Sequence, residues 1–316
     1  MGYNTEPKVA ILLPVYNGER TIHNTVESLL AQSFGDYRIL ACIDGSIDGS
    51  EEILRSFHDD RVQVIINKKN LGLGRTLNRL IYSLTWQPTY LAMAEQDDYY
   101  YPERLSLQVE LMDFRLDVGM SSGIAEFWDG QNVKSLFPGL LVRGMQYPEG
   151  RDMFLLNYIE QLKVVNSCAM IRTSVHTENG LYFSCHYPNV SVDWSYVLRF
   201  SALSKIVGIN QVLVRIERGP KRMSVTSDKE RQHRTARELL SNFRFEMPEI
   251  IVDSVYREAL VNHNLLELGN MKGTKYFLTL LGRLMTAPGE SRYYHDLSSR
   301  LRRALIPRIF SKLNLL

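Results

Sequence analysis

Short apolar runs alternate with amphipathic segments over the first 115 residues. Val9–Leu13 is a continuous apolar run closed by Pro14, and a segment with one apolar face opens at Thr21. This order predicts a strand, a loop and a helix. The same pattern recurs, and predicts strands at 37–43, 62–66 and 90–94 and helices at 51–57, 75–84 and 102–115.

Uninterrupted apolar strands alternating with amphipathic helices need a sheet that is covered on both faces, which is the parallel, doubly wound α/β arrangement. Ligands of such sheets bind beyond the carboxyl ends of the strands. After Gly119 the pattern becomes irregular, with a helix expected at 151–162. From Asp228 onward the chain reads as helical, with breaks at Pro248 and at Pro288-Gly289.

These shifts predict two domains. Residues 1–227 form the α/β domain, in which a nucleotide-binding half ends at about residue 118 and residues 119–227 shape the pocket for a second substrate. Residues 228–316 form an appended helical subdomain. A length of 316 residues leaves room for one large domain or two modest ones.

Composition excludes several classes of protein. A hydrophobic content of 45% and a charged content of 23% are typical of globular proteins, and a formal charge of +2 argues against nucleic acid as a partner. Cys42, Cys168 and Cys185 are odd in number and lack CxxC spacing, so neither a disulfide framework nor a zinc site is indicated. Without a leader sequence or an apolar window of about 18 residues, we expect a cytoplasmic protein.

The most informative loop is Glu95-Gln96-Asp97-Asp98, which ends an apolar run and precedes a helix that starts with Pro102. Carboxylates at the carboxyl end of a strand can hold a hard divalent cation, and this cation can neutralise a diphosphate. Two further polar loops, 14–19 and 44–50, follow earlier strands in the same way. Together they predict one nucleotide site, although three solvated carboxylates are the alternative interpretation of the acidic loop.

Two other phosphate or metal motifs are excluded. Asp44, Ser46 and Asp48 mimic the start of an EF-hand calcium loop, but Arg55 stands where that loop needs a bidentate acid. Asn70–Asn78 contains two glycines and lacks the Gly-Lys-Ser/Thr ending of a P-loop.

Five segments in this order resemble the inverting family 2 glycosyltransferases, which have a GT-A fold: PVYNGE, DGSIDGS, NLGLGRTLN, EQDDYYYPERL and SVDWSYVLRF. The resemblance covers Val9 to about Thr226, and no motif is assigned beyond Asp228. It implies a mixed, mostly parallel sheet with a helical C-terminal extension. It also implies transfer of a sugar from a nucleoside diphosphate to a hydroxyl group.

The resemblance implies a set of donor-binding residues. Pro14, Tyr16 and Glu19 would border the base, Asp44 would recognise uracil or its ribose, and Arg75 would approach the base or the phosphates. Ile43 stands where the family usually has a further aspartate. The structural alternatives are a plain turn between strand and helix for residues 14–19, a helix cap for Asp48, and a surface turn for Gly72 and Gly74.

Glu95-Gln96-Asp97 occupies the place of the family's DxD motif, with Glu95 where aspartate is usual. The resemblance makes Asp97 the ligand of Mn²⁺ or Mg²⁺, and Glu95 and Gln96 part of the donor site. Asp98 is expected to cap the helix that begins at Pro102.

Asp193 matches the family's general base, which would take the proton of the acceptor hydroxyl. Val192 replaces the glutamate that commonly precedes it and makes its surroundings more apolar; the alternative role of Asp193 is a helix N-cap. Asn166 falls where many relatives have histidine. Arg222, with Arg218 and Lys221, stands in a basic loop that would close over the diphosphate or remain solvated.

The final residues, 291–316, interleave basic and apolar side chains. They could lie on an anionic inner membrane leaflet as a peripheral contact, or pack on this chain or on a second copy as a homodimer. Pro307 is expected to interrupt the helix.

Taken together, the sequence predicts a metal-dependent, inverting, non-processive glycosyltransferase of cell-surface polysaccharide or glycolipid assembly. The expected donor is a UDP- or dTDP-sugar, and the expected acceptor is a saccharide or a lipid-linked saccharide. The family's QxxRW processivity signature is absent. A nucleotidyltransferase and a catalytically decayed nucleotide-sugar-binding scaffold are the alternatives.

Overall fold

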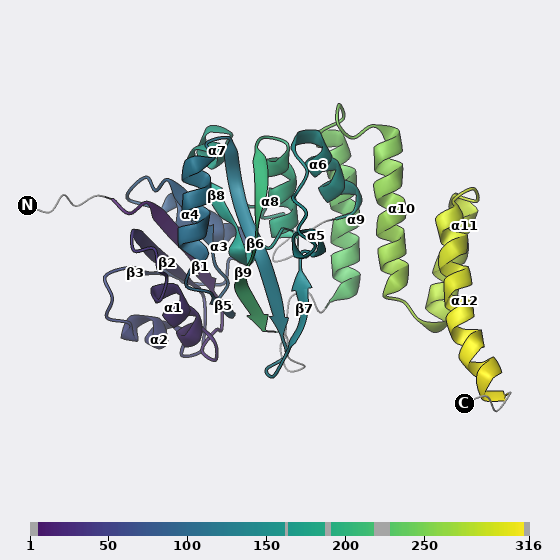
Figure 1. Ribbon diagram of the computed structural model, residues 1–316, viewed down its shortest axis with the longest axis horizontal. Coiled ribbons are helices and arrows are strands. Elements are labelled where there is room, and N and C mark those ends of the chain that lie inside the picture. The colour runs from purple at the N-terminus through teal and green to yellow at the C-terminus, as the bar shows by residue number, and fades with distance from the viewer. Residues whose placement is uncertain (1–5, 162–163, 187–190, 218–227, 313–316) are drawn as a thin grey trace, which may run out of the picture. The chain divides into compact units, whose positions relative to one another are not determined.

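The computed structural model describes residues 6–161, 164–186, 191–217 and 228–312, with the side chains of the last helix described through Leu301 (Figure 1). The chain divides into two units, Met1–Asp228 and Lys229–Leu316. The first is an α/β unit and the second is helical.

Within the described residues the α/β unit has one nine-stranded sheet in the order β3-β2-β1-β4-β8-β6-β9-β5, with β7 paired to β6. The pairs β1–β2, β1–β4, β2–β3 and β6–β9 are parallel, and the others are antiparallel. The strands are β1 (Val9–Val15), β2 (Tyr37–Asp44), β3 (Val62–Asn67), β4 (Tyr90–Met93), β5 (Asp98–Tyr100), β6 (Val118–Trp128), β7 (Val133–Phe137), β8 (Met170–Arg172) and β9 (Lys205–Glu217).

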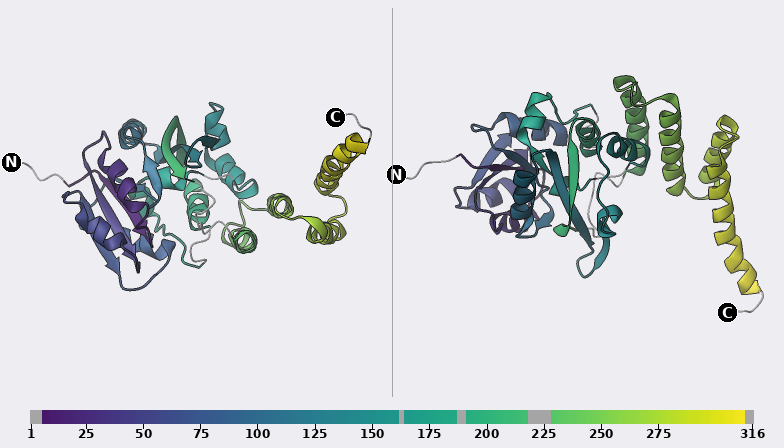
Figure 2. Two further views of the ribbon diagram at one scale, coloured as in Figure 1. Left: turned by 90° about the horizontal axis from the view of Figure 1, so that it is seen from below. Right: turned by 45° about the horizontal axis from the view of Figure 1, so that its top comes forward.

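Helices cover both faces of this sheet (Figure 1, Figure 2). In β1, Val9, Ile11 and Leu13 join one core cluster, whereas Ala10 and Leu12 join the other. The first cluster includes α1 (Ile22–Leu30), α2 (Ser50–Ser56) and α4 (Arg104–Phe114). The second includes α3 (Leu73–Tyr82), α5 (Gly139–Val142), α6 (Gly150–Ile159), α7 (Thr173–Glu178) and α8 (Val192–Ser201). This two-sided burial explains the continuous apolar runs of the sequence.

The expected mixed, mostly parallel fold is confirmed, with small shifts at the element ends. Helix α4 begins at Arg104, two residues later than expected, and its N-cap residue is Glu103. The expectation that Asp98 caps this helix is wrong, because Asp98 is a buried residue of β5. Pro102 and Glu103 form a turn before the helix begins.

A buried arginine supports the end of β4. Arg104 is fully buried, donates from Nη2 to the carbonyl of Met93 at 2.6 Å, and lies 4.7 Å from the centre of the Tyr100 ring. Its Nε donates to Gln108, whose amide donates to the carbonyl of Cys168 at 2.8 Å. These contacts fix the strand end that leads into the acidic loop, because they engage two of the three nitrogens of a buried charge, Nε and Nη2, whereas Nη1 has no partner among the described residues.

The helical unit consists of α9 (Lys229–Glu246), α10 (Asp253–Gly269), α11 (Gly273–Thr286) and α12 (Ser291–Lys312). Its core includes Leu268, Tyr276 and Tyr293. Arg300 donates to the carbonyls of Leu268 and Met271 and lies 4.0 Å from the centre of the Tyr276 ring. Among the described residues, no helix combines the length and the apolar character needed to cross a membrane.

The expectation that Pro307 interrupts the last helix is wrong, since α12 continues from Ser291 to Lys312. Proline removes one backbone donor from a helix, but its fixed φ is close to the helical value.

Candidate active site

The loops after β1 and β2 are joined by reciprocal hydrogen bonds. The N–H of Asn17 donates to Ser46 Oγ at 3.0 Å, and the N–H of Ile47 donates to Asn17 Oδ1 at 3.1 Å. Because each loop supplies both a donor and an acceptor, the two predicted nucleotide loops hold each other in place.

A second set of contacts, which involves Gly18, Glu19 and residues 48–50, links the same two loops. The N–H of Gly18 donates to Ser50 Oγ at 2.8 Å, and the N–H of Gly49 donates to Glu19 Oε2 at 2.9 Å. Asp48 accepts from the N–H of Glu19 at 3.1 Å and from the N–H of Ser50 at 3.1 Å, at the start of α2. Partial burial opposes ionisation of Asp48, but these hydrogen bonds and that of the Ser50 hydroxyl hold its pKa below the ordinary value.

Gln96 ties the acidic loop to the loop after β1. Its Oε1 accepts from the N–H of Tyr16 at 2.6 Å, and its Nε2 donates to the carbonyl of Tyr16 at 3.0 Å. A Cβ on Gly18 would lie 2.9 Å from Gln96 Oε1, so glycine is the residue that fits beside this amide. The Tyr16 side chain stays half-exposed, next to Pro14 near the end of β1.

Asp44, at the end of β2, holds the loop that follows β3. Its buried carboxylate accepts from Asn67 Nδ2 at 2.7 Å, from the N–H of Leu71 at 2.8 Å and from the N–H of Gly72 at 2.9 Å. These bonds position the start of α3, where Arg75 is exposed. Three protein donors thus already use the carboxylate that the sequence assigns to the donor base.

The acidic loop connects β4 to β5, with Glu95, Gln96 and Asp97 half-buried. The N–H of Glu95 donates to the buried Tyr100 hydroxyl at 2.7 Å. Asn166 Nδ2 donates to Glu95 Oε1 at 3.4 Å. Two residues that the sequence picked from distant segments therefore meet in the fold.

The donor set can be tested against a divalent cation. Across the described residues, no group of three or more His, Cys, Asp and Glu side chains could hold a metal ion. Mg²⁺ characteristically takes one or two protein carboxylates and completes its oxygen shell with substrate phosphates and water. Glu95 and Asp97, at the carboxyl end of β4, fit a cation of this kind.

Asp193 is the second residue of α8 and is half-buried. The N-cap residue is Ser191, with φ of 53°, so the N-cap position considered for Asp193 lies two residues earlier. Val192 is buried, as its apolar character predicts, and the Trp194 indole anchors the helix by donating to the carbonyl of Asn157 at 3.1 Å.

His176 and aromatic rings pack around Tyr196 of α8. His176 of α7 lies 2.8 Å from the Tyr196 hydroxyl through Nδ1, and the rings of Phe183 and Tyr196 stack at 4.2 Å. Burial lowers the pKa of His176 to about 4 and raises that of Tyr196. Both groups are therefore neutral near pH 7 and serve packing rather than proton transfer.

Some assigned residues cannot be placed. Arg218, Lys221 and Arg222 lie outside the described residues.

The three cysteines are free thiols, and burial raises the pKa of Cys42 to about 11, so this thiol is not a nucleophile at neutral pH.

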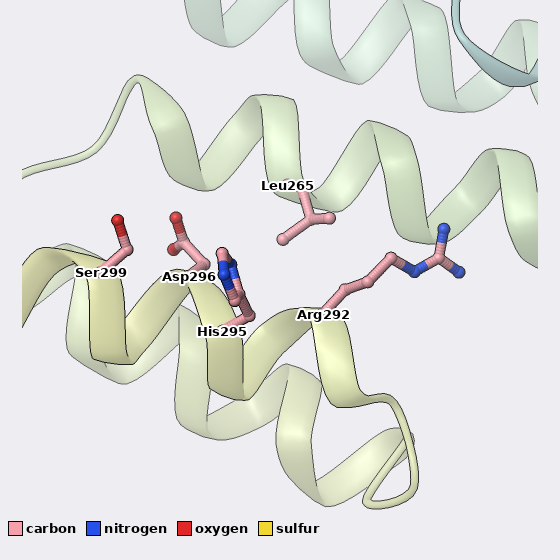
Figure 3. Close-up of a pocket in the computed structure, with 5 residues that line it drawn as sticks. All are labelled: Leu265, Arg292, His295, Asp296 and Ser299. Carbon is pink, nitrogen blue, oxygen red and sulfur yellow. The ribbon is translucent and has the colours of Figure 1, made fainter.

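A surface pocket of about 280 Å³ lies in the helical unit, not at these loops (Figure 3). It is lined by Leu265 of α10 and by Arg292, His295, Asp296 and Ser299 of α12. Arg292 is already paired with Glu290, so its charge is neutralised within the helical unit. It contains none of the residues that the sequence analysis assigned to the donor, the metal or the acceptor.

Sequence reasoning missed the residues that connect the loops, namely Asn17, Ser46 and Ser50. A signal was present, because the segment Asp44–Ser50 repeats Asp-Gly-Ser, and Ser and Asp side chains commonly bond nearby backbone groups. The buried Arg104 was also missed, since it lies on a helix whose composition reads as ordinary.

Residues 10–179 match the model of the family described as glycosyl transferase family 2. The chain belongs to this family. The match includes the loops after β1, β2, β3 and β4 and ends before α8, so Asp193 falls outside the matched region.

Among curated proteins, the chain is similar to the putative glycosyltransferase EpsE of Bacillus subtilis, with 28% identity over 179 residues, 54% of this chain and 64% of EpsE. It is also similar to the UDP-Glc:alpha-D-GlcNAc-diphosphoundecaprenol beta-1,3-glucosyltransferase WfgD of Escherichia coli, with 27% identity over 104 residues, 33% of this chain and 40% of WfgD. The chain thus matches less than two thirds of either relative.

Among solved structures, residues 1–349 of TarS from S. aureus, in complex with UDP-GlcNAc, have a TM-score of 0.64 and 18% identity. The alignment covers 81% of this chain and 72% of that structure. At this level of identity the similarity establishes a shared fold.

Proposed function

We propose that this family 2 member transfers one sugar per cycle from a nucleoside diphosphate donor to a hydroxyl group of a saccharide acceptor, with inversion at the anomeric carbon. The observation that carries the proposal is the meeting of four loops at one sheet edge. Those after β1, β2 and β4 are linked by Gln96, Asp48 and Ser46, and Asp44 holds the loop after β3.

On the donor side, the half-exposed Tyr16 ring and Pro14 would border the base, with Glu19 fixing the turn between them and α2. Asp44 would act through the loop it holds, which presents Arg75 to the diphosphate. Because a cationic side chain stabilises phosphate oxygens, an exposed Arg75 at this place favours a nucleoside diphosphate over a neutral ligand.

Asp97, with Glu95, would hold Mn²⁺ or Mg²⁺, which when bound supplies positive charge to the departing diphosphate. Asn166 would orient Glu95 through the contact of their side chains. Asp193 would accept the proton of the acceptor hydroxyl as its oxygen bonds to the anomeric carbon and the bond from that carbon to the diphosphate breaks. A single displacement of this kind inverts the anomeric centre.

The comparisons support the substrate classes. TarS has been solved with UDP-GlcNAc, and WfgD is named for UDP-glucose and a diphosphoundecaprenol-linked acceptor. We therefore propose a UDP-sugar donor, with a dTDP-sugar as the second choice, and a lipid-linked saccharide acceptor used in cell-surface polysaccharide assembly.

A donor screen tests this function. Thermal shift of the full chain with a panel of UDP-, dTDP- and GDP-sugars, with and without Mn²⁺, should give one donor whose stabilisation needs the metal, because a ligand bound only by the folded state raises the melting temperature. The same donor should be hydrolysed slowly, and Asp97→Ala should abolish both effects. Equal shifts and rates in wild type and Asp97→Ala would contradict the proposal.

We also propose peripheral contact with an anionic membrane through the helical unit. Helix α11 exposes an apolar stripe: Phe277 (52% exposed), Leu278 (66%), Leu281 (56%) and Met285 (77%). From Lys272 to Lys312 the sequence has nine basic and two acidic residues, a balance that favours anionic lipid. Arg292 and Arg300, which belong to the segment expected either to contact lipid or to pack on protein, form bonds inside the unit.

Co-sedimentation with phosphatidylglycerol vesicles tests the contact. Leu281→Asp should reduce binding about tenfold, whereas Leu203→Asp, on a similarly exposed leucine of the α/β unit, should not. A concentration-dependent dimer that Leu281→Asp dissociates, without vesicle binding, would contradict the membrane and favour a second copy.

A further inference from the structure

A row of side chains crosses the sheet at the strand ends beyond the acidic loop. Tyr99 of β5 pairs with Arg215 of β9, Arg215 pairs with Glu126 of β6, and Glu126 pairs with Leu136 of β7. Directly paired residues of neighbouring strands share one face of a sheet. The four side chains therefore form one continuous row. Together with Tyr101 and Trp128, whose rings contact Arg215, they are called the strip below.

This strip lies on the face of the sheet that carries α8. Ile124, two residues before Glu126, belongs to the core cluster of Val192 and Val197, whereas Ala125 belongs to the cluster on the opposite face. Because strand side chains alternate, Glu126 and Trp128 lie on the same face as α8 and Asp193. Tyr99 follows Asp97 by only two residues, so the strip adjoins the acidic loop.

Aromatic rings surround the Arg215 guanidinium. Its centre lies 4.7 Å from the Trp128 ring, 5.7 Å from Tyr99 and 5.8 Å from Tyr101, and the two tyrosine rings meet edge to face at 5.5 Å. The guanidinium pairs with the Glu126 carboxylate and donates to the Tyr101 hydroxyl at 2.9 Å. Tyr101 in turn donates to Glu126 at 2.6 Å.

The cluster is accessible. Tyr99 is 41% exposed, the Arg215 side chain is 35% exposed, and Trp128 and Tyr101 are half-buried. Glu126 neutralises Arg215, so the surface joins flat aromatic area to fixed polar groups and has little net charge. These are the features of a saccharide surface, because the C–H face of a pyranose packs on aromatic rings while its hydroxyls bond to polar groups at the rim.

We propose that Tyr99, Trp128 and the Glu126–Arg215 pair form the subsite that holds a pyranose ring of the acceptor. The inference rests on the proposed glycosyl transfer and adds which surface reads the acceptor. An anionic group is a poorer match, since Arg215 is already paired with a carboxylate and a tyrosine hydroxyl. The ring would lie between the acidic loop and the helix that carries Asp193.

Kinetics with defined glycosides test the subsite. UDP release from the donor found by the thermal-shift screen is measured with p-nitrophenyl glycosides of glucose, galactose and N-acetylglucosamine as acceptor probes. Tyr99→Ala and Trp128→Ala should raise the KM for the stimulating glycoside about tenfold, and should lower transfer more than donor hydrolysis. Trp128→Phe, which keeps a ring, should recover part of the affinity.

Tyr82→Ala provides the matched control, because Tyr82 is 82% exposed at the end of α3 and outside the strip. It should leave hydrolysis and transfer at wild-type values. Unchanged KM in both strip variants, or a wild type that hydrolyses the donor and responds to none of the glycosides, would overturn the subsite.

Two further outcomes separate the alternatives. Farnesyl phosphate serves as a phosphate probe. If Arg215→Ala weakens its binding, while Trp128→Ala leaves the KM for the glycoside unchanged, the subsite binds a phosphate and the saccharide proposal is overturned. Absence of any donor binding or hydrolysis by wild type would count against the proposed function; saturation-transfer NMR of the glycosides with wild type and Trp128→Ala then decides the subsite alone.

Discussion

The donor-side loops and the strip on β5, β6 and β9 are built by different kinds of contact. In the loops, Gln96, Asp44 and Ser46 bond to backbone N–H or carbonyl groups. In the strip, Arg215, Glu126 and Tyr101 bond to one another through their side chains. Side-chain hydrogen bonds therefore fix the main chain of the loops, whereas hydrogen bonds between side chains fix the surface of the strip.

This difference implies two responses to mutation. A substitution in the loops should change stability and donor affinity together, because the same bonds hold the backbone and shape the site. A substitution in the strip should change acceptor affinity with little effect on stability. The Tyr99→Ala and Trp128→Ala variants test the strip, and the four predictions below test the stability and donor affinity of the rest of the α/β unit, ordered from the largest expected effect on stability to the smallest.

Asp44→Ala should give the largest loss of stability. The change leaves the N–H groups of Leu71 and Gly72 and the amide of Asn67 without their buried acceptor, which costs about 3 kcal/mol or more. Urea denaturation followed by circular dichroism measures the loss. Asp60→Ala, at an exposed position, should stay within about 0.5 kcal/mol of wild type, and an equally small effect at Asp44 would refute the backbone-holding role.

Acidification should weaken the α/β unit through His176. Its pKa of about 4 in the fold lies below that of an exposed histidine, so the unfolded chain binds more protons between about pH 6.5 and pH 4. The stability contributed by the neutral ring is complete above pH 6.5, and about 2 kcal/mol of it is lost between pH 7 and pH 5. His176→Gln should flatten this dependence, and His58→Gln, at an exposed site, should not.

Gln96→Ala should lower stability by about 1 kcal/mol and UDP affinity by about fivefold, because two bonds that fix the Tyr16 backbone are lost. Isothermal titration with UDP, together with a melting curve, measures both. Gln131→Ala, on an exposed glutamine, should change neither. A loss of stability without a loss of affinity would show that the clamp does not shape the donor site.

Arg75→Ala should have the smallest effect on stability, within about 0.5 kcal/mol of wild type, because the side chain is exposed. UDP affinity should fall about fivefold, and less at high salt, since the interaction with phosphate is electrostatic and screened. Arg257→Ala, an exposed arginine of α10, should leave affinity unchanged. Equal affinities of both variants at low salt would remove Arg75 from the site.

The sequence predicted the nucleotide-binding half of the fold well, because β1 and β2 are apolar on both faces and the helices α1 and α3 each bury one apolar face. It predicted little of β6 and β9. Ser121 and Ser122 interrupt the apolar pattern of β6, and buried partners such as Gln108 satisfy them only in the folded chain. The register shifts between β6 and β9 likewise depend on tertiary pairing.

For the candidate site, the sequence indicated which residues lie at the sheet edge, but it did not indicate their hydrogen-bond partners. Glu95 and Asn166 were selected separately, and the fold brings them together. The carboxylate of Asp44 was assigned to the donor base, yet it accepts three hydrogen bonds from the protein. Sequence spacing reveals which residues reach a sheet edge, but the partner of each oxygen is decided by loops that meet only in three dimensions.

The central claim is that Asp97 and Asp193 act on one donor and acceptor pair from two sides. Its most direct test measures UDP affinity and the transfer rate in the same Asp193→Asn preparation. Loss of the base should lower kcat by roughly 10² to 10⁴ while UDP affinity and the melting temperature stay at wild-type values. A wild-type transfer rate in Asp193→Asn would contradict the claim.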